Sequence, residues 1–334
     1  MTTIIPGFEH RAGVHCGSTA ISDLLRFYDL DYSEALCFGL GSGLAFYYMR
    51  GKKLYPTHQI AGRTLTLEPD LCRHHGIPYQ WNTEEDAEKA WDAVRELVGK
   101  GTPVLLQTDL SQLDYYDTRT PFTLHRVVLV GYDDDAKVAY LADTDFPDLQ
   151  PVSYDSLRRA RTSTVPPFPV RNAWMTLDAR RPAVELPDAM RTAIIENARQ
   201  MLLGDRGRGG VENILEWAGE LPFWSEQAPD WVWCVRFAYQ VIERRGTGGG
   251  FFRLLYAGFL REVEAALPEA AQAGLAEEMA GIAQTWTDLA YRLKTISEEQ
   301  DPTTLEEVAP PFRKLALREQ HFYGRALKAV GSGI

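Results

Sequence analysis

Long apolar runs are missing from this chain of 334 residues. No stretch approaches the roughly 20 apolar residues of a transmembrane helix, and the first residues lack the charged segment and apolar core of a secretory signal peptide. Runs of Lys and Arg are also short and the formal net charge is −11, so we expect no basic face that could neutralise phosphates. The sequence therefore predicts a soluble, cytoplasmic protein that binds neither a membrane nor nucleic acid.

Cysteine is scarce, with residues only at positions 16, 37, 72 and 234 and no CxxC pair. Spacings this wide predict neither a disulfide framework nor a zinc site. Nothing else in the sequence indicates a metal or an organic cofactor. Cys37, Cys72 and Cys234 stand in apolar or mid-helical surroundings with no evident base nearby, so we interpret them as structural residues.

The pattern of apolar residues changes near residue 180. Before it, helical periodicity in residues 16–28 and 86–98 alternates with short runs rich in β-branched residues. Those runs predict strands at 104–108, 126–132, 138–143 and 173–177. After Pro182 and Pro187 only helical periodicity remains. We therefore expect an α+β domain over residues 1–180 and an all-α domain over residues 186–334.

Cys16 is predicted to start a helix, within the run His15-Cys16-Gly17-Ser18. A helix N-terminus stabilises a thiolate and makes a cysteine nucleophilic, although a lone cysteine there is more often a small buried residue. His15 is either a pH-sensitive neighbour of the thiol or an exposed loop residue. The chemistry also needs a base and a group that orients the base.

His125 and Asp143 are the candidates for these two roles. They flank a predicted hairpin whose turn contains Asp133-Asp134-Asp135, and their midpoint falls inside that turn. Cross-strand pairing would then place the Asp143 carboxylate beside the His125 imidazole. Asp145, two residues further on, is the alternative orienting acid.

A glycine-spaced turn occupies residues 39–43, with the sequence GLGSG. It matches only part of a dinucleotide-binding fingerprint, because a helical segment and not a strand precedes it. We interpret it as a tight turn that lets the backbone approach either the active site or a packed helix.

Several of these segments together resemble a known family. The residues are 10–48, with HCGSTA at 15–20 and FGLGSGLAF at 38–46, and HRVVLVGYD at 125–133 followed by LAD at 141–143. They look like the N-terminal domain of the butirosin-biosynthesis acyltransferase H family. The helical half, with GGGFFRLLY at 248–256 and IAQTWTDLA at 282–290, is similar to the domain of unknown function that often follows it.

This resemblance implies a papain-like fold with Cys16 as nucleophile, His125 as base and Asp143 as orienting acid. It further implies transfer of an acyl group from a carrier-protein thioester to an amine, in antibiotic or other secondary metabolism. Papain-like enzymes place an oxyanion-binding Gln where this chain has His10, six residues before the cysteine. We therefore expect the oxyanion to be bound by His10 or by backbone N–H groups at the helix start, close to His15 and Gly17.

Three functions remain open from the sequence. The first is an acyltransferase that uses a phosphopantetheine or coenzyme A thioester as co-substrate and a small-molecule acceptor. An acyl carrier protein would dock on a basic patch, either Arg50, Lys52 and Lys53 or Arg158, Arg159 and Arg161. The second is a cysteine amidohydrolase, peptidase or cyclase with the same triad.

The third function is a non-catalytic binding module. Its interface could use the aromatic pairs Trp231 with Trp233 and Phe223 with Trp224, although aromatic residues at helical spacing more often belong to the core. A homodimer is also open, and we expect the helical domain to cover the active-site cleft.

Overall fold

The computed structural model describes residues 2–166, 168–204 and 209–331. The chain divides into two compact units, and the division does not follow the chain linearly. The first unit combines Met1–Cys37 with His75–Ala183, and the second combines Phe38–His74 with Val184–Ile334. The expected division into 1–180 and 186–334 therefore misses one excursion, in which residues 38–74 leave the first unit and join the second.

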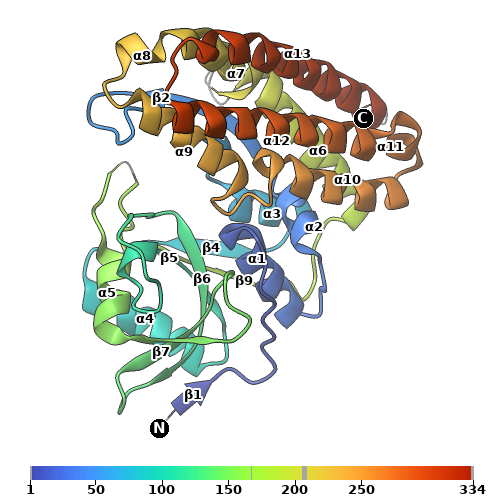
Figure 1. The fold of residues 1–334 in the computed structure, drawn as a ribbon. Helices are drawn as coiled ribbons and strands as arrows, with labels where there is room; N and C mark the ends of the chain where they lie inside the picture. Colours follow the sequence, from blue (N-terminus) through green and yellow to red (C-terminus); the bar gives the residue numbers. More distant parts are fainter. Residues whose placement is uncertain (1, 167, 205–208, 332–334) are drawn as a thin grey trace. The chain divides into compact units, whose positions relative to one another are not determined.

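The first unit is an α+β unit built on an antiparallel sheet (Figure 1). Its strands follow the order β4-β9-β5-β6-β7-β8, and β1 pairs with β6. Their bounds are β1 Thr2–Ile4, β4 Tyr79–Asn82, β5 Val104–Thr108, β6 His125–Asp133, β7 Val138–Ala142, β8 Gln150–Ser153 and β9 Trp174–Leu177. The predicted strands correspond to β5, β6, β7 and β9, and the short strands β1, β4 and β8 were not predicted.

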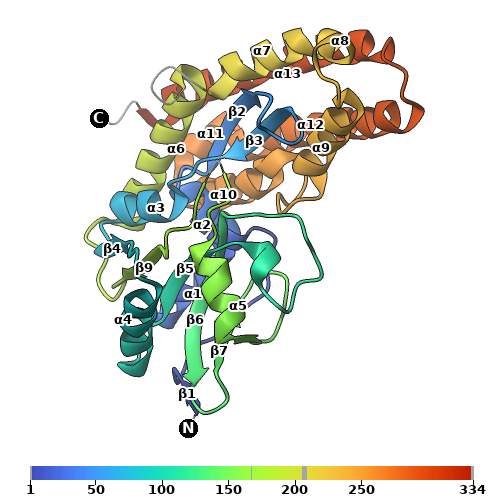
Figure 2. The same cartoon turned by 90° about the vertical axis from the view of Figure 1, so that its left-hand side faces the viewer.

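Helices pack on this sheet through apolar faces. Helix α1, Cys16–Phe27, contacts β6 and β5, and its residues 16–25 are all buried. Helix α4, Ala87–Gly99, buries Ala90, Val94 and Val98 at the four-residue spacing of one helical face. Together with α5, Tyr154–Thr162, it lies beside β5 (Figure 2). The predicted helices at 16–28 and 86–98 are confirmed as α1 and α4, whereas α5 was not predicted.

The second unit is mainly helical. Helices α2 (Glu34–Leu40) and α3 (Leu67–His75) cross from one unit to the other. The remaining α-helices are α6 Leu186–Leu203, α7 Gly210–Glu220, α8 Trp224–Gln227, α9 Trp231–Glu243, α10 Arg253–Ala266, α11 Pro268–Ala273, α12 Leu275–Glu299 and α13 Thr304–Val330. Short 3-10 turns are η1 Leu110–Gln112 in the first unit and η2 Leu221–Phe223 and η3 Gly250–Phe252 in the second. Among the described residues no strand follows β9, as the loss of β-type patterning predicted.

A β-hairpin also belongs to the second unit. Strands β2, Leu44–Arg50, and β3, His58–Arg63, pair with each other and contact α7 and α9 (Figure 2). Two buried hydrogen bonds connect this region to α6, because Asn197 Nδ2 donates to the Leu44 carbonyl at 2.7 Å and Ser42 Oγ donates to the Ala193 carbonyl at 3.0 Å. Three helices of the second half, α6, α7 and α9, therefore pack against a hairpin that lies far upstream in the sequence.

The glycine-spaced turn at residues 39–43 makes this packing close. A Cβ added to Gly39 would lie 1.9 Å from the Phe259 ring of α10, and one added to Gly41 would lie 2.5 Å from the Leu67 carbonyl. Glycine is therefore required for backbone approach inside the second unit. Of the two interpretations of this turn, approach to an active site or to a packed helix, the structure supports the packed helix.

The first unit thus has a helix that begins at a cysteine and packs on an antiparallel sheet whose strand β6 begins at a histidine. This is the papain-like arrangement that the family resemblance implies, and a helical region follows it.

Candidate active site

Cys16 is the first residue of α1, as predicted, and the residue is 7% exposed. The helix is capped by His15, whose Nδ1 accepts the Ser18 N–H at 3.2 Å. Before the helix, the Glu34 carboxylate accepts the N–H groups of Val14 and His15, at 3.1 and 2.8 Å. These contacts fix the backbone on both sides of the sulfur, which lies at the positive end of the helix dipole.

His125 and Asp143 form a buried hydrogen-bonded pair. Nε2 of His125 lies 2.8 Å from Oδ2 and 3.0 Å from Oδ1 of Asp143, and the residues are 2% and 1% exposed. The predicted contact therefore exists. The register behind it differs from the prediction, because β6 pairs Val128 with Ala142 and Leu129 with Leu141, and an irregularity follows before Gly131.

Extending that register would place His125 opposite residue 145. Strand β7 ends at Ala142 instead, and the chain turns at Asp143, whose carbonyl accepts the N–H of Phe146 at 3.1 Å. The Asp143 side chain consequently reaches His125 diagonally from the end of its strand. The sequence thus indicated the contact between Asp143 and His125, but from a predicted strand register that differs by two residues from the register in the structure.

The His125 ring also interacts with the side chain of Cys16. Since Nε2 is bonded to Asp143, Nδ1 is the ring nitrogen left for the sulfur, and the Cys16 side chain is a hydrogen-bond partner of this ring. Burial alone would lower the pKa of His125, but the charge and hydrogen bond of Asp143 and the proximity of Cys16 raise it to about 10. The site thus favours an imidazolium next to the sulfur.

Two tyrosines that the sequence did not indicate complete the surroundings of Asp143. The hydroxyl of Tyr115 donates to Oδ2 at 2.7 Å, and that of Tyr116 lies 3.2 Å from Oδ1. Burial tends to raise the pKa of Asp143, but His125 and the two hydroxyls outweigh it and hold the pKa below its ordinary value. No periodic pattern marks residues 115 and 116, so only their position in an aromatic segment with Phe122 could have drawn attention to them.

Asp145 does not contact His125 in the structure. It accepts a hydrogen bond from Tyr116 at 2.8 Å and is exposed. Asp143 is therefore the acid that contacts His125, whereas Asp145 is connected to this pair only through the Tyr116 hydroxyl.

His10 has a different place from the one expected. Its Nδ1 lies 2.5 Å from Oδ2 of Asp23, and its Nε2 lies 2.8 Å from the Phe146 carbonyl and 3.1 Å from the Asp143 carbonyl. All these partners are acceptors, so both ring nitrogens carry a proton. This occupies both nitrogens and leaves neither for an oxyanion, which corrects the expectation that His10 binds it.

The first turn of α1 offers the remaining candidate donors for an oxyanion. The Ser18 N–H is taken by His15, which is 3% exposed and therefore is not the exposed loop residue of the second interpretation. Among the described residues no side chain caps the N–H of Gly17. Backbone N–H groups at Cys16 and Gly17 are thus the candidates for binding an oxyanion.

The other three cysteines are buried. Burial raises the pKa of Cys72, and it raises that of Cys234 to about 11, which makes both thiols poor nucleophiles. Within the described ranges, no cluster of three or more His, Cys, Asp or Glu side chains is arranged to hold a metal ion. No helix among the described residues is long and apolar enough to cross a membrane.

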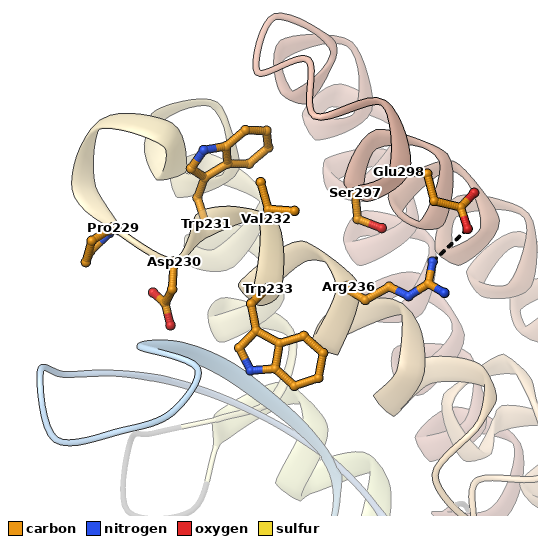
Figure 3. A pocket seen from close by; sticks show the side chains of 8 residues that line it. All are labelled: Pro229, Asp230, Trp231, Val232, Trp233, Arg236, Ser297 and Glu298. Atoms are coloured by element: carbon orange, nitrogen blue, oxygen red, sulfur yellow. Dashed lines mark hydrogen bonds and ion pairs between the residues drawn. The ribbon is translucent and has the colours of Figure 1, made fainter.

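A pocket of about 410 Å³ lies in the second unit, at the start of α9 and the end of α12 (Figure 3). Trp231 and Trp233 line it, together with an ion pair in which Arg236 Nη1 lies 2.9 Å from Glu298 Oε1. The two tryptophans considered as an interface of a binding module are therefore partly buried in a pocket wall. Of the neighbouring pair, Trp224 is fully buried and Phe223 is 51% exposed.

Two family models match consecutive parts of the chain. The family model described as "Butirosin biosynthesis protein H, N-terminal" matches residues 15–144, and the one described as "Domain of unknown function (DUF4872)" matches residues 155–326. The first match encloses Cys16, His125 and Asp143. A solved structure described as a C39-like peptidase from Bacillus anthracis is 16% identical, with a TM-score of 0.38 over 55% of this chain and 99% of that one. Curated protein sequences give no match.

Proposed function

Because the chain belongs to the family described as Domain of unknown function (DUF4872), preceded here by a butirosin biosynthesis protein H N-terminal domain, we propose that it is a cysteine acyltransferase of secondary metabolism. It would take an acyl group from a thioester and pass it through Cys16 to an amine. One observation carries the proposal. The sulfur at the start of α1 adjoins a buried histidine whose other nitrogen is bonded to a buried carboxylate.

The first half-reaction forms an acyl-cysteine. The Cys16 thiolate attacks the thioester carbonyl, and the developing oxyanion is bound by N–H groups of the first turn of α1. The carbon–sulfur bond of the donor then breaks, and the departing thiolate takes a proton from the His125 imidazolium. The products are an acyl-Cys16 thioester, the free donor thiol and neutral His125.

The second half-reaction releases the acyl group as an amide. An amine attacks the acyl-Cys16 carbonyl, and neutral His125 accepts a proton from the amine nitrogen. The bond to sulfur breaks and restores the thiolate beside the imidazolium. Asp143 keeps its charge throughout, orients the ring and stabilises its protonated form.

A thioester suits this site better than an amide as the acyl donor. A thiolate leaving group needs little help from an acid, whereas an amine leaving group must be protonated as the bond breaks. With the pKa of His125 raised to about 10, the imidazolium is a weak acid that suffices for a thiol. The proposed donors are accordingly acyl groups on coenzyme A or on the phosphopantetheine of a carrier protein.

For a carrier protein, the burial and contacts of the basic residues favour one of the two patches as the proposed docking surface. Arg161 is 2% exposed and its guanidinium lies 3.4 Å from the Ala90 carbonyl, so it belongs to the interior and not to a docking face. Lys52 and Lys53 are exposed, and Arg50 beside them is paired with Glu220. We therefore place the proposed carrier contact at Lys52 and Lys53, since carrier proteins are acidic.

The test is to incubate the protein with acyl-coenzyme A thioesters of increasing chain length and weigh it by intact mass spectrometry. We expect one added acyl group in the wild type and none in Cys16→Ala. Adding a panel of amines should discharge the acyl-enzyme as amide. Release of free acid alone would identify a hydrolase, and a cyclic product would identify a cyclase. If no donor acylates the protein, the non-catalytic binding module becomes the favoured function.

The carrier contact has its own control. Charge reversal in Lys52→Glu/Lys53→Glu should reduce transfer from an acylated carrier protein about tenfold or more and leave transfer from acyl-coenzyme A unchanged. If the wild type and the double variant take the acyl group from the carrier protein at equal rates, Lys52 and Lys53 are not the docking surface. The proposed chemistry at Cys16 would be unaffected by that result.

A further inference from the structure

The tyrosine loop, which we define as residues 110–122, presents Tyr115 and Tyr116 to the candidate site. Its ends are fastened together, because the N–H of Leu110 donates to the Phe122 carbonyl at 3.0 Å. The carboxylate of Asp109, which is fully buried, also accepts the N–H groups of Ser111 and Phe122, each at 3.1 Å. The loop is thus closed on itself and holds the two tyrosines on a fixed base.

Both hydroxyls of this loop reach the same buried carboxylate. Tyr115 bonds to Oδ2 of Asp143 and Tyr116 to Oδ1, so each oxygen has one hydroxyl donor besides His125 Nε2. The ring of Tyr116 also stands edge-on to the His125 ring, with centroids 5.7 Å apart and planes at 85°. The loop therefore touches both members of the His–Asp pair, and it lies outside the three residues that would carry the chemistry.

We propose that Tyr115 and Tyr116 are positioning residues that fix the ionised Asp143 carboxylate against His125 and thereby maintain the reactive state of Cys16. This inference rests on the proposed function. A carboxylate that is 1% exposed must be stabilised by donors, or it rotates or takes up a proton. Either change would deprive His125 of its counter-charge, and Cys16 would then lose the cation that stabilises its thiolate.

The charged and titratable groups around Asp143 define the expected pH behaviour. From β6 it faces His125, and from the tyrosine loop it faces Tyr115 and Tyr116. The N-terminal segment contributes His10, which bonds to the Asp143 carbonyl, and Asp145 shares the Tyr116 hydroxyl. Only the tyrosines and His125 donate to the carboxylate itself among the described residues.

The experiment measures the rate at which iodoacetamide alkylates Cys16 between pH 4 and 10, with the modified residue identified by mass spectrometry. The wild-type profile should rise along an acid limb, where the thiolate forms beside the imidazolium, to a plateau that persists at high pH, because a thiol with the ordinary pKa of about 8.5 is ionised there even after His125 loses its proton. In Tyr115→Phe and in Tyr116→Phe we expect this acid limb to move to higher pH. The shift should be about one pH unit, as for loss of one hydrogen bond to a charged group.

Tyr154→Phe is the matched control. Its hydroxyl also bonds to a carboxylate of the first unit, Asp134 at 3.1 Å, but that pair does not include Asp143 or His125. Its profile should superimpose on the wild type. Asp145→Ala removes the competing partner of Tyr116, so the acid limb should stay in place or move to lower pH.

The outcomes separate this inference from the proposed function. If Cys16 reacts fast in the wild type and slowly in His125→Ala at pH 6, while the acid limbs of both Tyr→Phe variants match the wild type or lie at lower pH, the positioning role is wrong and the proposed chemistry stands. If wild-type Cys16 reacts no faster than the other cysteines, the proposed function itself fails. Should Tyr115→Phe not fold, Tyr116→Phe decides the question, and alkylation rates that fall without any shift of the acid limb would indicate a merely structural role.

Discussion

The Nε2 atom of His125 lies 2.8 Å from Oδ2 of Asp143, although the register of β6 and β7 sets these two residues diagonally rather than opposite each other. Their contact depends on the place where β7 ends, since Asp143 is the first residue after Ala142. A carboxylate at a strand end can rotate toward a diagonal neighbour, and here the tyrosine hydroxyls hold it in that orientation. Asp143 is thus the acid paired with His125 because β7 ends just before it and because two tyrosine hydroxyls hold its carboxylate in place.

Replacing His125 by Ala should slow the alkylation of Cys16 by about 100-fold at pH 6. Without the imidazolium the thiol would titrate nearer its unperturbed pKa of about 8.5, and well under 1% of it would be thiolate at that pH. The measurement is the alkylation rate of each cysteine by mass spectrometry. Cys72 and Cys234, whose pKa is raised by burial, serve as internal references and should react slowly in both proteins.

Asp143→Asn should shift the acid limb of Cys16 alkylation to higher pH. The charge of Asp143 opposes the effect of burial and raises the pKa of His125, so a neutral amide leaves burial to lower that pKa and removes the imidazolium that stabilises the thiolate. Asp145→Asn is the matched variant and should leave the limb in place, because Asp145 contacts Tyr116 and not His125. Equal shifts in the two variants would assign the orienting role to both acids.

His10→Gln should destabilise the protein by about 1–3 kcal/mol below neutral pH. Burial lowers the pKa of His10, but the hydrogen bond and charge of Asp23, with the two carbonyl contacts, raise it above the ordinary value of 6.5. The stabilisation is therefore complete below pH 6.5 and is lost as the pH rises through the raised value in the folded state. Urea unfolding between pH 5 and 9 would measure this.

The control for His10 is Arg11→Gln. The side chains of Arg11 and its partner Asp31 are 58% and 62% exposed, so this change should cost less than about 1 kcal/mol at every pH. A pH-independent loss in His10→Gln would mean that the ring contributes packing alone.

Glu319→Gln should destabilise the second unit by about 3–5 kcal/mol. Arg253 and Glu319 are both fully buried, with Nη2 of Arg253 2.9 Å from Oε2 of Glu319. Neutralising the acid leaves a buried guanidinium without its counter-ion. The same unfolding measurement on Arg236→Gln, which breaks a pair with partly exposed partners, should show less than about 1 kcal/mol.

Gly39→Ala should cost about 1–3 kcal/mol, because the added Cβ would overlap the Phe259 ring. A Cβ added to Gly324, inside α13, would have no neighbouring atom within 4 Å, so Gly324→Ala should stabilise the protein by about 0.5–1 kcal/mol. Thermal unfolding of the two variants tests the sign of each change. A stable Gly39→Ala would show that α10 can move away from the turn.

The sequence by itself determined those features that depend on neighbours along the chain. Apolar spacing marked α1 and α4, β-branched runs marked β5, β6, β7 and β9, and the loss of such runs marked the start of the helical region. The Cys16 helix start and the pairing of His125 with Asp143 were found in the same way, because a hairpin brings residues on either side of one short turn together.

Only the tertiary structure decided the rest. Tyr115 and Tyr116 stand in an irregular loop without periodicity, and their bonds to Asp143 depend on how that loop closes. His10 matched the place of an oxyanion donor in sequence, but Asp23 and two carbonyls occupy both of its nitrogens. The hairpin of residues 44–63 joins helices more than 100 residues away. Contacts of this kind follow from packing across long separations, which local patterns of residue type do not encode.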